Sequence, residues 1–430
     1  MKKIFVAAFA LLGFLPFASA QTGTWSGDLE VQGMKFSLVF HFEEENPTLD
    51  IPDQGAMGLP MSVSRTDAGE VTVNVPTLNA TFKGQLQDGK IPGTFTQMGA
   101  SLPFTLTPGV KKLNRPQTPQ GPFPYAQEEV SFANGDAVLQ GTLTLPEGVS
   151  RKTPVLIMVT GSGQQNRDEE IFEHKPFVVL ADALARAGVA TLRYDDRGFG
   201  ASTGDAANAD TDDFKEDALA GIKFLRERFD KVGVIGHSEG GTIALMLAVE
   251  KQADFIVSLA GMAISGEETL IWQTDLALIA SGVAQEHVEK YNALLREAYA
   301  ALRAGKELPS PEGRGLAPLL VQSYYGVLAQ MQTPYLKRFI DLDMQPLLGK
   351  ISCPVLALNG TVDQQVEPES NLGALREGLK GNPKAVVEAV EGVNHLFQHS
   401  ATGQMTEYRE IEETFAPEAL RRVVEWVTSL

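Results

Sequence analysis

A serine between glycines is the clearest sign of chemistry in this chain. Residues 234–241 read VIGHSEGG, so Ser238 lies in a Gly-x-Ser-x-Gly pattern between Gly236 and Gly240. The pattern follows an apolar run with strand character and precedes a run with helical character. A turn of this kind holds the serine hydroxyl above the end of a sheet, and only small flanking residues permit it. Ser238 is therefore the candidate nucleophile.

A serine hydroxyl needs a base within hydrogen-bond reach, and that base needs a third group to orient it. Among the six histidines, His395 directly follows the last strand-like run. Serine turns of this type occur with the chain order Ser, Asp or Glu, His, with the histidine in that last loop. We therefore predict His395 as the base, with His399 as the second candidate. Asp363, just past a glycine after the preceding strand-like run, is the predicted acid.

Acyl transfer also needs two backbone N–H donors for the developing oxyanion. Glu239, directly after the serine, is expected to supply one. The second is expected from the glycine-containing segment after the strand-like run 155–160. Ser162 is the preferred donor there and Gly163 is the alternative. The side chains of His237 and Glu239 are expected to pack beneath or beside the serine turn.

Other polar clusters fit structural roles better than ligand sites. The glycine-containing segment after residue 160 lacks the Gly-Lys-Ser/Thr of a phosphate loop. The acidic run between residues 205 and 213 lacks the spacing of a calcium loop and precedes a predicted helix, where acids are favoured. His395 and His399 have the spacing of a zinc pair, but no Glu-rich helix surrounds them. We expect no metal and no cofactor.

The elements that position these residues follow from length and periodicity. At 430 residues, with 43% hydrophobic and 21% charged side chains, the chain is expected to form two soluble domains. Residues 1–20 have the basic, apolar and Ala-x-Ala regions of a secretory signal, which predicts export to a periplasm or the cell exterior and a mature start at Gln21. An N-terminal membrane anchor is the weaker alternative, because the apolar run is short and Pro16 interrupts it.

Residues 21–108 alternate apolar and polar side chains between turn signals, which predicts a small all-β barrel or sandwich. A proline-rich linker is expected at 109–125. From 126 to 430, strand-like and helical runs alternate as in βαβ units on a largely parallel sheet. Within this region, residues 265–348 form an insertion with helical periodicity, which we interpret as a lid. Helices are expected there at 269–279, 285–304 and 335–342.

Charge and cysteine content limit the partners. The formal net charge is −18, and loss of Lys2 and Lys3 with the signal would make it −20, which makes nucleic acid a poor partner. No integral membrane span is expected after signal cleavage. Cys353 is the single cysteine, so no intrachain disulfide forms, and it is expected to fill core space. The sequence leaves the oligomeric state open.

Together these residues resemble a known group, the secreted bacterial serine esterases of the α/β-hydrolase fold, in the branch of dienelactone hydrolase and the prolyl-oligopeptidase-like enzymes. The resemblance covers about residues 126–430. It rests on the segments GSGQQNRD (161–168), YDDRGFGAS (194–202) and GHSEGG (236–241), and on Asp363 and Asn394-His395. It implies an α/β-hydrolase fold and a metal-free serine hydrolase that acts on carboxylic esters through an acyl-enzyme. With the elements predicted above, the expected architecture is an α/β-hydrolase fold with a helical lid insertion, preceded by a small all-β domain. It assigns Ser238, Asp363, His395 and the N–H of Glu239 the roles given above. Many relatives have His where this chain has Thr160, which affects hydrogen bonding in the adjacent segment.

The predicted function is hydrolysis of small carboxylic esters through an acyl-enzyme, as in a carboxylesterase. A peptidase or amidase of the prolyl-oligopeptidase-like branch is the enzymatic alternative. A third hypothesis makes the β domain a module that binds a surface, lipid or glycan and recruits the hydrolase. It rests on the apolar stretch 55–61. Acyl and alcohol specificity cannot be inferred from sequence, because they depend on how the insertion folds over the site.

Overall fold

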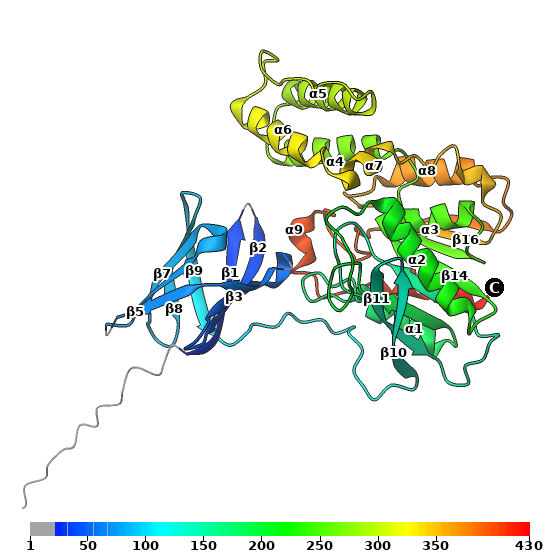
Figure 1. The fold of residues 1–430 in the computed structure, drawn as a ribbon, viewed down its shortest axis with the longest axis horizontal. Coiled ribbons are helices and arrows are strands. Elements are labelled where there is room, and N and C mark those ends of the chain that lie inside the picture. Colours follow the sequence, from blue (N-terminus) through cyan, green and yellow to red (C-terminus); the bar gives the residue numbers. More distant parts are fainter. Residues whose placement is uncertain (1–21, 32, 55, 67) are drawn as a thin grey trace, which may run out of the picture. The chain divides into compact units, whose positions relative to one another are not determined.

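The computed structural model describes residues 22–430 except 32, 55 and 67, and the predicted signal at 1–20 lies outside the described residues. The chain divides into two compact units, Met1–Leu113 and Asn114–Leu430 (Figure 1). The division falls within the expected linker, and residues 109–125 contain no helix or strand. The described residues include no helix with the length and hydropathy of a membrane span.

The first unit is one antiparallel sheet of nine strands in the order β4-β3-β2-β1-β9-β8-β7-β6-β5. The strands are β1 (Gly23–Val31), β2 (Met34–Phe42), β3 (Thr48–Ile51), β4 (Ala56–Pro60), β5 (Ser62–Arg65), β6 (Glu70–Val75), β7 (Ala80–Gln85), β8 (Ile91–Gln97) and β9 (Ala100–Pro108). Strands β4 and β5 are the two ends of the sheet, yet only Met61 separates them in the chain. The sheet must therefore curl until its ends meet, which confirms an all-β domain with a nearly closed, barrel-like form.

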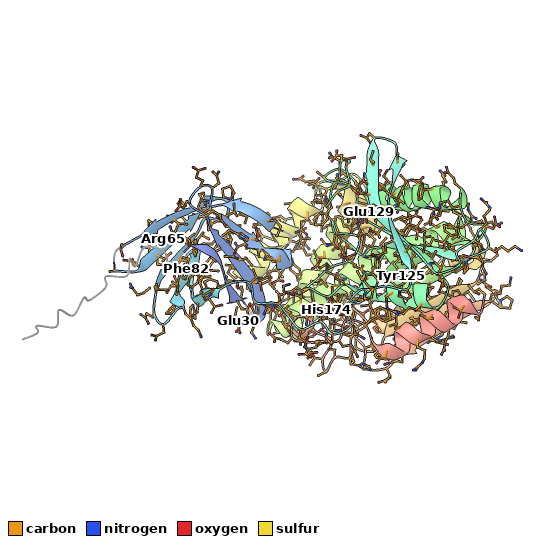
Figure 2. The ribbon with its side chains drawn as sticks, turned by 90° about the horizontal axis from the view of Figure 1, so that it is seen from below. Glu30, Arg65, Phe82, Tyr125, Glu129 and His174 are labelled. Carbon is orange, nitrogen blue, oxygen red and sulfur yellow. The ribbon has the colours of Figure 1, made fainter. Side chains whose placement is uncertain are left out.

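Aromatic rings fill the interior of this sheet. Phe40, Phe82 and Phe104 are buried, and the rings of Phe82 and Phe104 meet edge to face at 5.5 Å. Figure 2 places Phe82 among the strands of this unit. Since side chains alternate between faces along a strand, the alternating apolar positions of the sequence supply this interior.

The second unit contains an eight-stranded sheet in the order β10-β11-β13-β12-β14-β15-β16-β17. Strand β11 pairs antiparallel with both of its neighbours, β10 and β13. The remaining pairs, β13-β12, β12-β14, β14-β15, β15-β16 and β16-β17, are parallel. The strands are β10 (Ala126–Asn134), β11 (Ala137–Leu145), β12 (Val155–Val159), β13 (Ala190–Tyr194), β14 (Val232–His237), β15 (Ile256–Leu259), β16 (Val355–Gly360) and β17 (Ala385–Val390). This sheet confirms the predicted α/β architecture.

Helices cover both faces of the sheet. On one face, α2 (Thr211–Arg226), α3 (Glu239–Val249) and α8 (Pro368–Gly378) pack with strand residues such as Val155 and Ile157. On the other, α1 (Pro176–Arg186) and α10 (Pro417–Thr428) pack with Leu156 and Met158. Successive residues of β12 thus belong to opposite cores, which explains why this strand is apolar at every position.

The insertion between β15 and β16 is helical. It contains α4 (Gly266–Ala280), α5 (Gln285–Arg303), α6 (Pro318–Gln330) and α7 (Pro334–Asp341), which stand together as a group in Figure 1. A separate core that includes Tyr291, Leu295 and Tyr324 joins them. The periodicity predicts α4, α5 and α7, but it misses α6, whose apolar residues do not gather on one face. A short helix α9 (Met405–Tyr408) follows β17.

Candidate active site

Ser238 occupies a strained turn between β14 and α3. Its backbone has φ 54° and ψ −119°, a conformation that L side chains rarely adopt. The turn is compact because its glycines touch backbone: a Cβ on Gly240 would lie 2.0 Å from the carbonyl oxygen of Val159. The N–H of Ser238 donates to the carbonyl of Leu259 at 2.8 Å, which ties the turn to β15. Strain of this size persists only where the surrounding structure fixes it.

His395 and Asp363 meet at the carboxyl edge of the same sheet. His395 Nδ1 lies 2.8 Å from Asp363 Oδ2, and both side chains are buried. The other carboxylate oxygen of Asp363 accepts the N–H groups of Gln365, at 2.7 Å, and Val366, at 3.0 Å. A carboxylate only accepts, so Nδ1 carries the proton and Nε2 is left to act as a base.

The expected oxyanion donors are Glu239, which directly follows the serine, and a residue of the segment after β12. Glu239 is the first residue of α3, and the first N–H groups of a helix have no acceptor within it. In the segment after β12, Gly161 already donates its N–H to Glu169 Oε1 at 2.8 Å. Ser162 lines the same cavity as Ser238, whereas Gly163 lines a separate, much smaller cavity. The arrangement favours Ser162 over Gly163 as the second donor.

A cavity of about 360 Å³ brings these groups together. Its lining residues are Gly161, Ser162, Gln165, Glu169, Ile171, His237, Ser238, Leu270, Gln273, Tyr335, Leu336, Phe339, Gln365, His395, Leu396, Met405 and Tyr408. Helices α4 and α7 of the insertion supply much of the apolar wall, as expected for a lid. Among these described lining residues there is no Lys, Arg or Asp, and Glu169 is itself buried.

His399, the second candidate for the base, lies elsewhere. It is exposed, and its ring contacts Glu413 through Nδ1 at 2.9 Å and Glu418 through Nε2 at 2.8 Å. Since both ring nitrogens face carboxylates and the residue is not part of the cavity wall, it has no access to Ser238.

Glu239 also connects the serine turn to the insertion. Its side chain is buried and accepts hydrogen bonds from Thr211 Oγ1 at 2.6 Å and from the hydroxyl of Tyr335 at 2.8 Å. Burial raises the pKa of this carboxyl, and these hydrogen bonds oppose the shift. Arg338, one turn further along α7, pairs with Asp212 at the start of α2 at 2.7 Å. Helix α7 is thus held by two side-chain contacts, one of them to the residue that directly follows Ser238. Sequence reasoning identified no contact of Tyr335, because its helical pattern does not say what the helix packs against.

The polar segment around Thr160 has its own hydrogen bonds. Thr160 Oγ1 donates to Asp196 Oδ1 at 2.8 Å, and the N–H of Gln165 donates to Asp196 Oδ2, also at 2.8 Å. Burial raises the pKa of Asp196 to about 8. Arg167 pairs with Asp195 at 3.0 Å. Asp195 and Asp196, which directly follow β13, therefore hold this segment in place although position 160 is not a histidine.

The remaining polar clusters are structural, as expected. Asp210 caps α2 by accepting the N–H of Asp212, and Asp213 completes a reciprocal capping box. Arg197 pairs with Asp217 at 2.7 Å. Cys353 packs against the core, and burial raises the pKa of its thiol to about 11.

Comparison with known proteins identifies the family of the second unit. A model of the alpha/beta hydrolase family matches residues 156–407, which is more than half of the chain. The chain belongs to the alpha/beta hydrolase family. The fold class expected from the sequence is thereby confirmed.

Among relatives of this hydrolase, esterase EstD from Thermotoga maritima is 28% identical over 316 residues, which is 72% of this chain and 67% of that protein. Its name agrees with the expected enzyme class, a carboxylesterase-like hydrolase. Similar solved structures include the esterase Pf2001 from Pyrococcus furiosus (18% identity, 75% of this chain and 98% of that chain, TM-score 0.43). A proline iminopeptidase from Mycobacterium smegmatis is also similar (17% identity, 70% and 98%, TM-score 0.44).

Proposed function

We propose that this hydrolase cleaves carboxylic esters through an acyl-enzyme on Ser238. The observation that carries the proposal is the hydrogen bond between His395 Nδ1 and Asp363 Oδ2, made beside a cavity that Ser238 and His395 both line. It fixes the histidine tautomer that a serine nucleophile needs.

The reaction follows from the roles of these groups. Ser238 Oγ attacks the acyl carbonyl while His395 Nε2 takes its proton, and Asp363 stabilises the imidazolium without taking the proton. The carbonyl oxygen becomes an oxyanion near the N–H groups of Glu239 and Ser162, where the N-terminus of α3 adds a favourable dipole. His395 returns the proton to the leaving alcohol. Water, activated by the same histidine, then releases the acid and restores Ser238.

The cavity supports small, uncharged esters as substrates. Its described walls carry apolar side chains and the amides of Gln165, Gln273 and Gln365, with no Lys or Arg side chain to pair with a carboxylate or phosphate on the substrate. A volume of about 360 Å³ lies at the small end of ligand pockets.

The test is a panel of nitrophenyl esters with acyl chains of increasing length and a matched panel of peptide nitroanilides. Wild type should hydrolyse short esters and leave the anilides intact. Ser238→Ala should lose ester turnover, and Ser281→Ala, at an exposed serine after α4, should keep it. Equal ester turnover by Ser238→Ala and wild type would overturn the proposal. Faster cleavage of anilides than of esters would replace it with a peptidase.

Export is a further part of the proposal. The pattern of residues 1–20 supports a cleaved signal and a periplasmic or extracellular enzyme. The segments 161–168, 194–202 and 236–241 support a place in the branch of dienelactone hydrolase and the prolyl-oligopeptidase-like enzymes. N-terminal sequencing of the protein from an exporting bacterial host should begin at Gln21. An intact Met1 in the cytoplasmic fraction would contradict it.

A further inference from the structure

Next to the His395–Asp363 pair lies a second buried histidine and carboxylate that the proposed reaction does not use. His237 Nδ1 lies 3.0 Å from Glu169 Oε1, and His237 Nε2 lies 2.8 Å from the backbone carbonyl oxygen of His395. Both side chains are almost fully buried. The rings of His237 and His395 are 4.7 Å apart between centroids.

The partners of His237 determine its protonation. A carbonyl oxygen can only accept a hydrogen bond, so Nε2 must carry a proton. Glu169 Oε1 already accepts the N–H of Gly161, which suits a carboxylate, so Nδ1 donates as well. Burial lowers the pKa of His237, but the Glu169 carboxylate and the hydrogen bonds outweigh it, and the pKa is raised. The charge of Asp363 also acts on the ring and favours the imidazolium.

These hydrogen bonds join three segments that carry different parts of the site. Glu169 holds the segment after β12 through Gly161, beside the predicted oxyanion donor Ser162. His237 directly precedes the nucleophile, and its Nε2 holds the backbone of the base. A buried ion pair adds little stability, because desolvation offsets the attraction. Glu169 also has φ 53°, a costly backbone conformation for this residue type. A role in positioning the residues of the site would explain why the chain keeps both the buried ion pair and the strained backbone of Glu169.

We propose that Glu169 and His237 are a positioning pair, in which the carboxylate keeps both ring nitrogens protonated so that the ring fixes the oxyanion segment and the base against the serine turn. The catalytic function of this pair rests on the proposed esterase activity. Its protonation does not, and the two are tested separately.

The first test concerns protonation and uses the wild-type protein. In ¹⁵N NMR spectra of histidine-labelled protein, His237 should show two protonated ring nitrogens at pH 7.5. The resonances are assigned by their loss in His237→Gln. A single protonated nitrogen in the wild type would overturn the proposal, whether or not the protein hydrolyses esters.

The second test concerns geometry. In Glu169→Gln the ring becomes neutral. If the new amide N–H donates to the unprotonated Nδ1, it can no longer accept the N–H of Gly161, and if the amide oxygen accepts from Nδ1, Nε2 has no proton for the carbonyl of His395. In either case one of the hydrogen bonds that join the three segments is lost. We expect kcat for a nitrophenyl ester to fall about tenfold or more, because small displacements of reacting groups are costly, while KM changes less than about twofold. Glu170→Gln, at the exposed neighbouring carboxylate, is the matched control and should match wild type.

If Glu169→Gln keeps the kcat of the Glu170→Gln control, the positioning role is wrong while the esterase proposal stands. If Glu169→Gln does not fold, the same comparison is made with Glu169→Asp, whose shorter carboxylate keeps the charge but cannot reach both partners. Because it can hold only one of them, that variant should also show a kcat about tenfold or more below that of the control, while its KM changes less than about twofold. Loss of kcat with unchanged protonation and a raised KM would also contradict the proposal.

Discussion

His395 Nδ1 lies 2.8 Å from Oδ2 of Asp363, and backbone N–H groups of Gln365 and Val366 hold the other oxygen of that carboxylate. The position of the Asp363 carboxylate is therefore fixed by backbone hydrogen bonds that do not involve the imidazole. This arrangement leaves one ring nitrogen of His395 as an acceptor, which is the requirement for removing a proton from a serine.

Asp363→Asn should reveal how much this arrangement contributes. An amide can donate to Nδ1 and thereby stabilise the wrong tautomer, so we expect kcat for a short ester to fall by roughly 10³–10⁴-fold with little change in folding. Asp343→Asn, at an exposed aspartate after the insertion helices, should retain wild-type kinetics. A loss below tenfold in Asp363→Asn would remove Asp363 from the mechanism.

Leu336→Ala should change acyl-chain preference. Leu336 lies on α7 and lines the cavity, so its truncation should enlarge the space and raise kcat/KM for longer acyl chains relative to acetate. The measurement is the ratio of kcat/KM for octanoate and acetate esters. Leu319→Ala, at a leucine that is 73% exposed on α6, makes the same substitution away from the cavity and should leave the ratio unchanged. An equal ratio in both variants would show that α7 does not bound the acyl site.

Gly240→Ala should destabilise the serine turn. The added Cβ would lie 2.0 Å from the backbone oxygen of Val159, which cannot move without displacing β12. We expect reduced soluble yield and a lowered free energy of unfolding in urea. Gly326→Ala in α6, where nothing lies within 4 Å of the new Cβ, should be neutral or stabilising by about 0.5–1 kcal/mol. The reverse order of stabilities would contradict the close packing described for the turn.

His399 should contribute stability that depends on pH. Partial burial lowers the pKa of His399, but Glu413 and Glu418 outweigh it, so the pKa in the folded protein lies above the unfolded value of about 6.5. The contribution is therefore fully present below about pH 6.5 and is lost as the pH rises through the folded pKa. His399→Gln should lower the free energy of unfolding at pH 5.5 by no more than about 1 kcal/mol, because the pair is exposed. At pH 9 the two proteins should match. A larger difference in the free energy of unfolding between the two proteins at pH 9 than at pH 5.5 would contradict a raised pKa of His399 in the folded protein.

Periodicity and chain order predict most of the fold and the acid–base pair. The strand-like runs predict β12 to β17 to within about two residues, because buried strands are short apolar runs between clear breaks. Asp363 and His395 follow two of those strands, and parallel strands bring their carboxyl ends to one edge. The order of strands around β12, β13 and β14 is not visible in the sequence, since it depends on long-range pairing.

The rest of the site depends on contacts between distant segments. Glu169 and His237 are 68 positions apart, and Tyr335 and Glu239 are 96 apart. No local sequence pattern links either pair. A buried polar residue also looks the same in the sequence whether it only fills space in the core or positions a catalytic group. Helix α6 is missed because exposed apolar residues, such as Leu319 and Tyr325, obscure the spacing of the residues that it buries within the insertion.

The central claim is that Ser238 is an activated nucleophile, and covalent labelling tests it most directly. A fluorophosphonate reacts with a serine only when a neighbouring base activates it. After treatment of the full chain, peptide mass spectrometry should find one phosphonate per chain, on Ser238, and ester turnover should fall in step with labelling. Asp363→Asn should label far more slowly. A protein that hydrolyses esters while Ser238 stays unmodified, or that loses activity through a label on another residue, would contradict the account.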